Sequence, residues 1–130
     1  MDSIYDNVKV LASLVPATRT ASANGTGVDT LGYNDAVALI LAGDIDLAST
    51  DETYAFKVQH SDDNSTFSDV TGATTTVTAD NDVKLIRLSN LNTTIKRYVR
   101  VVATLGGTTP SWPGSAVFLL GTPASAPVNS

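Results

Sequence analysis

The sequence predicts an all-β fold in a single domain, built as a sandwich or a barrel. Threonine, valine and serine abound, and the apolar runs are short. Clusters of glycine, asparagine and aspartate separate these runs at regular intervals, as turns separate strands. A chain of 130 residues with 42% hydrophobic residues can form one core, and the absence of cysteine means that this core must hold without disulfides.

The first half of the chain contains three predicted strands. Residues 36–41 are a continuous apolar run, too short for a typical helix, and predict a strand buried on both faces. Residues 54–60 alternate between apolar and polar side chains, which is typical of a half-buried strand. Residues 8–15 are predicted to form a strand that ends at Pro16. A short helix is the alternative there, because four apolar residues also recur at helical spacing: Ile4, Val8, Leu11 and Val15.

The second half contains four more predicted strands. Residues 74–78 are expected to form an exposed, threonine-rich strand, and residues 83–88 follow a turn of aspartate and asparagine. Residues 95–105 are the longest strand candidate, and residues 116–120 are the last.

These elements place the predicted sandwich domain in residues 1–121, with residues 1–12 as a candidate arm. Residues 122–130 are rich in proline, alanine and serine and are predicted to be an extended C-terminal tail. No charged residue occurs in residues 101–130. We therefore expect this uncharged end to be covered, either by the fold or by another subunit.

The overall charge argues against a nucleic-acid partner. The net charge is −5 and the pI is about 4.4, so the phosphates of DNA repel the average surface. One region nevertheless concentrates five cations, which could form a DNA-binding patch, pair with acidic residues, or contact a protein partner: Lys84, Arg87, Lys96, Arg97 and Arg100. The second and third interpretations are favoured.

The sequence also predicts no membrane partner. No apolar run approaches the ~18 residues that cross a bilayer. The N-terminal Met1 and Asp2 do not begin a basic region followed by a long apolar stretch, so no secretory signal is expected and synthesis in a cytoplasm is predicted.

The residue inventory gives little support for an enzyme. His60 is the only histidine, and it alternates in phase with Phe56 and Val58. This position favours a strand-end residue that is hydrogen-bonded to backbone over a catalytic base. Acidic pairs such as Asp62 and Asp63 are interpreted as Asx turns, because the spaced ligands of a calcium loop are missing. The sequence therefore predicts no catalytic residue, no cofactor and no metal site.

Trp112 is the main candidate for an interface anchor. Pro110 and Pro113 flank it, which indicates a rigid, exposed loop, and aromatic side chains in such loops often anchor interfaces. Stacking on a sugar and simple packing on its own domain are the alternatives. The predicted interface therefore comprises Trp112 and its two flanking prolines. Arg97 and Arg100 are added to it as charged contacts.

Three stretches of the chain are similar to a known family. The first comprises SLVPATRTAS at residues 13–22, GTGVD at 25–29 and the Gly-Tyr pair at 32–33. The second is VQHSDDNSTFSDV at residues 58–70, and the third is KRYVRVV at 96–102 followed by SAVFLLG at 115–121. In this order the stretches resemble small structural proteins of tailed bacteriophages, associated with jelly-roll proteins that decorate or cement the capsid. His60 and the short connection at residues 71–78 depart from the family pattern.

The resemblance implies a single antiparallel β-sandwich of the jelly-roll type with extended terminal arms. It further implies a non-enzymatic decoration protein, made in the host bacterial cytoplasm, that binds the major capsid protein on the outer surface of the virion. A homotrimer is expected, since closed symmetry would hide the uncharged end. The alternative is a carbohydrate- or receptor-binding β-sandwich from a phage fibre or tail component.

Overall fold

Nine strands and one short helix form in the residues that the computed structural model describes, which are 3–89, 91 and 94–124. The helix is the only one in this part of the chain, and no helix there is long and apolar enough to cross a membrane. In chain order the elements are α1 (Ile4–Asn7), β1 (Lys9–Arg19), β2 (Ala23–Asn24), β3 (Val28–Asp29), β4 (Tyr33–Ala42), β5 (Thr53–Ser61), β6 (Ser68–Thr76), β7 (Val83–Arg87), β8 (Tyr98–Gly106) and β9 (Trp112–Pro123).

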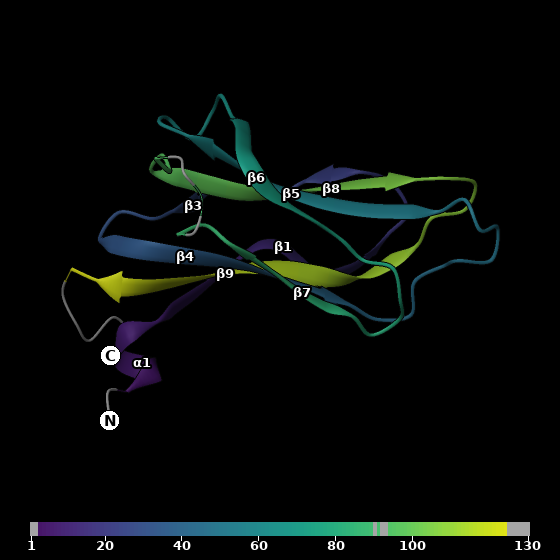
Figure 1. The fold of residues 1–130 in the computed structure, drawn as a ribbon, viewed down its shortest axis with the longest axis horizontal. Helices are drawn as coiled ribbons and strands as arrows, with labels where there is room; N and C mark the ends of the chain where they lie inside the picture. Colours follow the sequence, from purple (N-terminus) through teal and green to yellow (C-terminus); the bar gives the residue numbers. More distant parts are fainter. Residues whose placement is uncertain (1–2, 90, 92–93, 125–130) are drawn as a thin grey trace.

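The strands form two antiparallel sheets that pack face to face (Figure 1). Sheet A has the order β1-β9-β4-β7. Sheet B has the order β2-β8-β5-β6, and β3 pairs with β8 on the same side as β2, so that β2 and β3 act as one interrupted strand. Counted in this way, four strands lie in each sheet, and their orders are those of a jelly roll. The predicted all-β sandwich of the jelly-roll type is confirmed.

The core lies between the sheets and is built from alternate residues of the central strands. In β4, Ala36, Ala38 and Ile40 are buried, whereas Val37 and Leu39 between them are partly exposed. The prediction that residues 36–41 are buried on both faces is therefore wrong. Only one face of β4 meets sheet B, and nothing in the described residues covers the other face.

Trp112 belongs to this core rather than to an exposed loop. Its side chain is 0% exposed, and its ring meets the edge of Phe56 from sheet B with ring centroids 4.8 Å apart. The indole Nε1 donates a hydrogen bond to the carbonyl oxygen of Leu41 at 3.1 Å, and the Arg19 guanidinium lies 5.4 Å from the ring centroid. The expectation of an exposed anchor is thus wrong, and packing of Trp112 on its own domain is what the structure shows.

Strand β1 is longer than predicted and irregular. It continues past Pro16 to Arg19, and its register against β9 shifts twice, on either side of Leu14. Pro16 lies in the second shift of an edge strand, where a missing backbone N–H disturbs no regular ladder. The helix considered as an alternative for this region forms only upstream, at α1, where the Ser3 hydroxyl accepts a hydrogen bond from the Asp6 N–H.

Ser13 occupies the first shift of β1 and ties the two sheets together. Its hydroxyl accepts a hydrogen bond from the Val101 N–H in β8 at 3.0 Å and donates one to the Thr26 carbonyl at 2.9 Å. Gly25 passes so close that an added Cβ would lie 2.2 Å from the Ser13 hydroxyl and 2.7 Å from the Val101 carbonyl. Only glycine fits at this crossing from sheet A to sheet B.

The remaining strand boundaries also differ from the prediction, most of all for the strand predicted at residues 74–78, which begins six residues earlier. Strand β6 begins at Ser68 and ends at Thr76, and its residues 70–73 bulge opposite the single residue Val58 of β5. Strand β8 begins at Tyr98 instead of residue 95. At the termini, residues from Lys9 onward already pair in sheet A, and β9 runs to Pro123. Most of the predicted tail, residues 125–130, lies outside the described residues.

We predict that Trp112→Ala lowers the free energy of unfolding by about 3–5 kcal/mol, because it removes the largest fully buried side chain and leaves a cavity beside Phe56. Denaturant unfolding followed by circular dichroism measures the loss. Leu85→Ala, at a side chain that is 63% exposed, is the control and should change stability by less than about 0.5 kcal/mol. Equal effects of the two substitutions would contradict the placement of Trp112.

Candidate interaction surface

The outer face of sheet A is apolar over most of its area. Residues that point away from the core lie side by side in three cross-strand rows. The first row is Val10, Leu119, Val37 and Arg87; the second is Ala12, Val117, Leu39 and Leu85; and the third is Ser115, Leu41 and Val83. We refer to the nine apolar residues of these rows as the apolar face.

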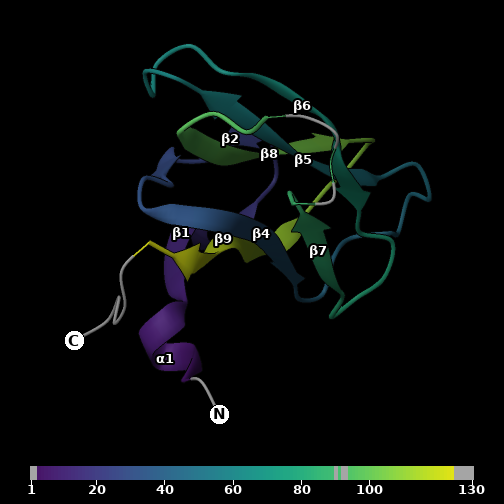
Figure 2. The same cartoon turned by 60° about the vertical axis from the view of Figure 1, so that its left-hand side comes forward.

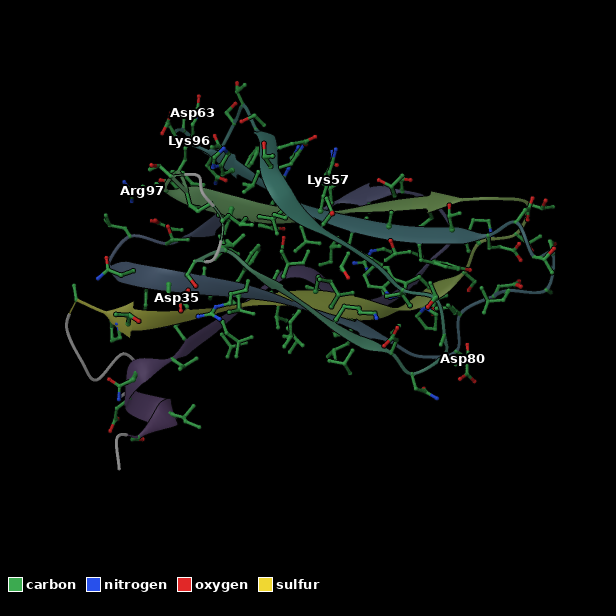
Figure 3. All side chains as sticks on the ribbon, in the orientation of Figure 1. Asp35, Lys57, Asp63, Asp80, Lys96 and Arg97 are labelled. Atoms are coloured by element: carbon green, nitrogen blue, oxygen red, sulfur yellow. The ribbon has the colours of Figure 1, made fainter. Side chains whose placement is uncertain are left out.

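The exposure of these side chains shows that the surrounding protein does not cover them. Val10, Val83 and Leu85 are 57%, 56% and 63% exposed, and the apolar residues of β9 in these rows are partly exposed. In Figure 3 the side chains that project from the lower surface of sheet A are largely carbon. A sheet with one face on the core normally alternates to polar residues on its solvent face. The apolar face is therefore a candidate contact surface for another protein.

The outer face of sheet B has the opposite character. Lys57 of β5 forms an ion pair with Asp69 of β6 at 3.0 Å. Beside it, Arg100 of β8 donates two hydrogen bonds, at 2.9 and 2.7 Å, to the side-chain oxygen of Gln59. The labelled Lys57, Lys96 and Arg97 all lie on this side of the molecule (Figure 3). Lys57 is thus paired with a carboxylate and Arg100 with an uncharged amide oxygen, so both cations have partners within the same chain.

Helix α1 projects from the same side of the molecule as the apolar face. Figures 1 and 2 both show it extending below sheet A, away from sheet B. None of its residues is buried, and Ile4 is 78% exposed. The apolar face and α1 thus expose apolar side chains on the same side of the molecule.

The size of the apolar face indicates what kind of contact it can make. Four strands about 4.8 Å apart and three outward rows about 6.8 Å apart cover on the order of 400 Å². A standard specific interface takes roughly 800 Å² from each partner. The face alone therefore supports a weak contact, which becomes strong when it is combined with a second contact or repeated in an assembly.

The structure does not bring the five predicted interface residues together. Arg97 and Arg100 lie at the start of β8, beside β3. Pro110, Trp112 and Pro113 lie at the other end of that strand, where the chain turns into β9. Arg97 is exposed and bound to the Asp29 carboxylate through two nitrogens at 2.9 and 2.8 Å, and Pro113 pairs in sheet A opposite Thr18.

Sequence reasoning missed the apolar face, although a signal for it exists. Residues 36–41 and 116–120 are both continuous apolar runs that become strands. Every second side chain of a strand points to the opposite face, so two adjacent runs of this kind require two apolar faces. The core of a two-layer sandwich covers one of them.

The predicted pairing of cations with acidic residues is confirmed for three of the five clustered cations. Arg97 pairs with Asp29, and the other two pairs join Lys84 to Asp82 and Lys96 to Asp62, each at 3.5 Å. The bidentate contact with Arg97, together with the Leu31 N–H, lowers the pKa of Asp29 to about 2.

Asp63 behaves as the sequence predicts. Its carboxylate accepts hydrogen bonds from the backbone N–H groups of Ser65 and Thr66, each at 3.0 Å, which is the geometry of an Asx turn. These bonds and one from the Ser61 hydroxyl lower its pKa to about 2. Among the described residues no group of three or more histidine and acidic side chains is arranged to hold a metal ion.

His60 is a strand-end residue hydrogen-bonded to backbone, as predicted. Its side chain is 6% exposed, and its Nδ1 accepts a hydrogen bond from the Lys96 N–H at 3.1 Å, so this nitrogen carries no proton. Burial, reinforced by the Lys96 charge and opposed by the Asp62 carboxylate, lowers the pKa of His60 below 6.5. The histidine therefore stays neutral and tethers the segment that precedes β8.

A shallow hollow of about 380 Å³ opens at the end of the sandwich where β4 begins. Most of the side chains that line it are apolar or uncharged polar. Among the described lining residues, Asp35 is the one charged residue and Tyr33 is the one aromatic residue.

Comparison with known proteins supports the fold. No protein-family model matches the chain, and no curated protein matches it. Among solved structures, the fold is similar to that of the PBSX exported protein XepA, with a TM-score of 0.56 and 16% sequence identity. The match covers 100% of this chain and 42% of that chain, so this chain spans less than half the length of XepA. At this identity the likeness concerns the fold alone.

We predict that the free energy of unfolding falls as the pH drops from 7.5 to 5.5. The unfolded state takes up a proton near pH 6.5, whereas folded His60, with its lowered pKa, resists protonation, so the unfolded state gains protons first. The slope is at most about 1.4 kcal/mol per pH unit. Denaturant unfolding at several pH values measures it.

His60→Gln is the matched control, because glutamine keeps an acceptor for the Lys96 N–H and does not titrate. The variant should lose most of the pH dependence in this window. Asp29 and Asp63, with pKa values of about 2, affect stability only at lower pH. A wild-type stability that is flat from pH 7.5 to 5.5 would refute the neutral, buried state of His60.

Proposed function

We propose that this protein is a non-enzymatic structural subunit of a tailed-bacteriophage particle and that it decorates the outer surface of the capsid in many copies. The observation that carries the proposal is the contrast between the two outer faces of the sandwich. Sheet A exposes the apolar face, whereas sheet B exposes paired charges such as Lys57 and Asp69. Such a module has one side suited to an assembly and one side suited to solvent.

Two further observations favour a phage setting. Three stretches within residues 13–121 resemble small structural proteins of tailed phages. The fold is also shared with an exported protein of the phage PBSX. Neither observation identifies a binding partner for this chain. We include the major capsid protein in the proposal because a decorating subunit must bind the shell.

The modest size of the apolar face favours a role in a repeated structure. A contact of about 400 Å² is too small to hold an isolated pair of proteins firmly. On a shell, the same weak contact recurs at every copy, and linked contacts strengthen one another. A rigid two-layer sandwich suits this role because it presents the same surface in each copy.

A carbohydrate- or receptor-binding role in a fibre or tail has less support. Sugar binding usually relies on several exposed aromatic side chains, but Trp112 and Tyr54 are fully buried, and Tyr33 and Tyr98 are half-buried. Tyr5, at 63% exposure, is the one aromatic side chain among the described residues that is largely exposed. Binding to a glycan array, with a glycan-dependent rise in melting temperature, would favour that role over decoration.

The test is to purify particles on a density gradient and to quantify this chain against the major capsid protein. We expect a high, fixed copy ratio that persists in heads without tails. A low copy number, co-fractionation with tails alone, or absence from particles would overturn the decoration role. Mass spectrometry with labelled reference peptides of both chains gives the ratio, and a tail protein that is lost from tail-less heads serves as the control.

A further inference from the structure

Two charged side chains on the outer face of sheet A have no ion-pair partner. Arg87 of β7 lies in the first outward row, and Asp35 of β4 lies one outward position beyond Val37 of that row. Among the described residues neither side chain forms an ion pair. Their hydrogen bonds are local, from the Arg87 guanidinium to the Ser89 hydroxyl at 3.1 Å and from the Ala36 N–H to the Asp35 carboxylate at 2.8 Å. Each face therefore offers one cation and one carboxylate to a partner.

The surroundings of Asp35 leave room for a side chain from another molecule. Its neighbour across the strands is Gly121 of β9, and a Cβ added to Gly121 would meet no atom within 4 Å. Helix α1 leaves sheet A before β1 begins at Lys9 (Figure 2). The helix borders the outer face without covering it, since Val10, close to it in sequence, remains 57% exposed. A partner can therefore reach both the apolar face and the carboxylate beside it.

The two unpaired charges make the outer face complementary to a second copy of itself. In a twofold contact, residue i of one copy meets residue j of the other, and residue j of the first meets residue i of the second. One Arg87 and one Asp35 on each face therefore give two ion pairs at the border of the apolar contact. A different partner would need a carboxylate and a cation of its own at matching positions, whereas a second copy already has both.

We propose that two copies of this chain pair through the outer faces of sheet A, with Arg87 of each copy bound to Asp35 of the other. Antiparallel sheets with apolar faces ordinarily pack face to face about 10 Å apart, as sheets A and B do within one molecule. The charged outer faces of sheet B then remain in solvent on both sides of the pair. Because each copy uses the same surface, the contact is closed and growth stops at two copies.

The area of the contact indicates a weak pair. With the row of Asp35 and Gly121 included, the outer face of sheet A covers on the order of 500 Å². Two such faces bury about 1,000 Å² in all, which is the lower limit for a specific interface. We therefore expect a dissociation constant in the micromolar range and a pair that separates on dilution.

This proposal goes beyond capsid decoration, because it concerns the free protein and holds with or without a particle. It uses the same face, so the two copies must separate before either can place its apolar face on a shell. A weak pair permits this exchange, since contacts repeated on a shell strengthen one another. Pairing would thus keep the apolar face out of water until a shell is present.

Sedimentation velocity of the full chain from 5 to 500 µM tests the proposal. Wild type should pass from monomer to dimer as the concentration rises. Leu85→Lys in the apolar face should raise the dissociation constant about tenfold or more, because it places a charge in an apolar contact. Thr104→Lys adds the same charge to the exposed outer face of sheet B and should pair like wild type. Thermal melts confirm that the variants are folded, and Val83→Ser replaces Leu85→Lys if that variant unfolds.

A mixture of two variants tests the reciprocal ion pairs. Asp35→Lys puts two cations at each pair and Arg87→Glu puts two carboxylates there, so each variant alone should pair several-fold more weakly than wild type. Fluorescently labelled Asp35→Lys should recover most of the lost affinity when Arg87→Glu is added, because the introduced lysine then meets the introduced glutamate at both pairs. Lys57→Glu, with the same charge change on sheet B, is the control and should not restore pairing.

A wild type that stays monomeric throughout, or that forms the expected trimer, would overturn the proposal. So would a Leu85→Lys variant that pairs normally, or a recovery that Lys57→Glu produces as well as Arg87→Glu. The Leu85→Lys result decides the matter if Asp35→Lys proves unfolded. Because no particle is involved, failure here is separate from failure of the decoration role, which the copy ratio alone decides.

Discussion

The structure depends on one constraint, the two-residue period of side chains along β4 and β9. One set of alternate residues, including Ala38, Ile40 and Phe118, is fully buried against sheet B and forms the centre of the core. The same period forces Leu39 and Val117 to the opposite surface. The fold requires only that the first set be apolar, because a solvent face tolerates polar residues. The apolar character of the second set is therefore not required by the fold.

The outer faces of the two sheets differ in polarity, so the molecule has one apolar side and one charged side. Where β5 and β8 face outward, their charged side chains meet partners within the same chain, as Arg100 meets Gln59 and Lys57 meets Asp69. Because these side chains already have partners, the outer face of sheet B offers few unpaired groups to another protein. The apolar face and α1 both point the other way (Figure 1). The two outer faces therefore differ in character, even though each half of the sandwich is an ordinary antiparallel sheet. In the proposed role, sheet A would face the partner and sheet B would face solvent.

What the sequence could predict depended on whether the deciding contacts are local. Residues 54–60 and 116–120 were predicted as strands because periodicity is local, and the Asx turn at Asp63 is closed within three residues. The prediction of an exposed Trp112 was wrong. Its flanking prolines indicate a loop, but its side chain is covered by Phe56 and Arg19, which are far away in the sequence. The apolar face was missed for a related reason. A continuous apolar run looks the same whether both faces or only one face will be covered by the rest of the chain.

The irregular edges of the two sheets limit how copies of this protein can associate. Each sheet has two outermost strands, and each of these is imperfect. Strand β1 contains Pro16 and two register shifts, β2 and β3 are interrupted, β6 bulges at residues 70–73, and β7 is five residues long with two cations. Open, regular edges would let copies join strand to strand without limit and form fibrils. Blunted edges leave the flat faces as the remaining route of association, so that growth can stop at a finite, soluble size.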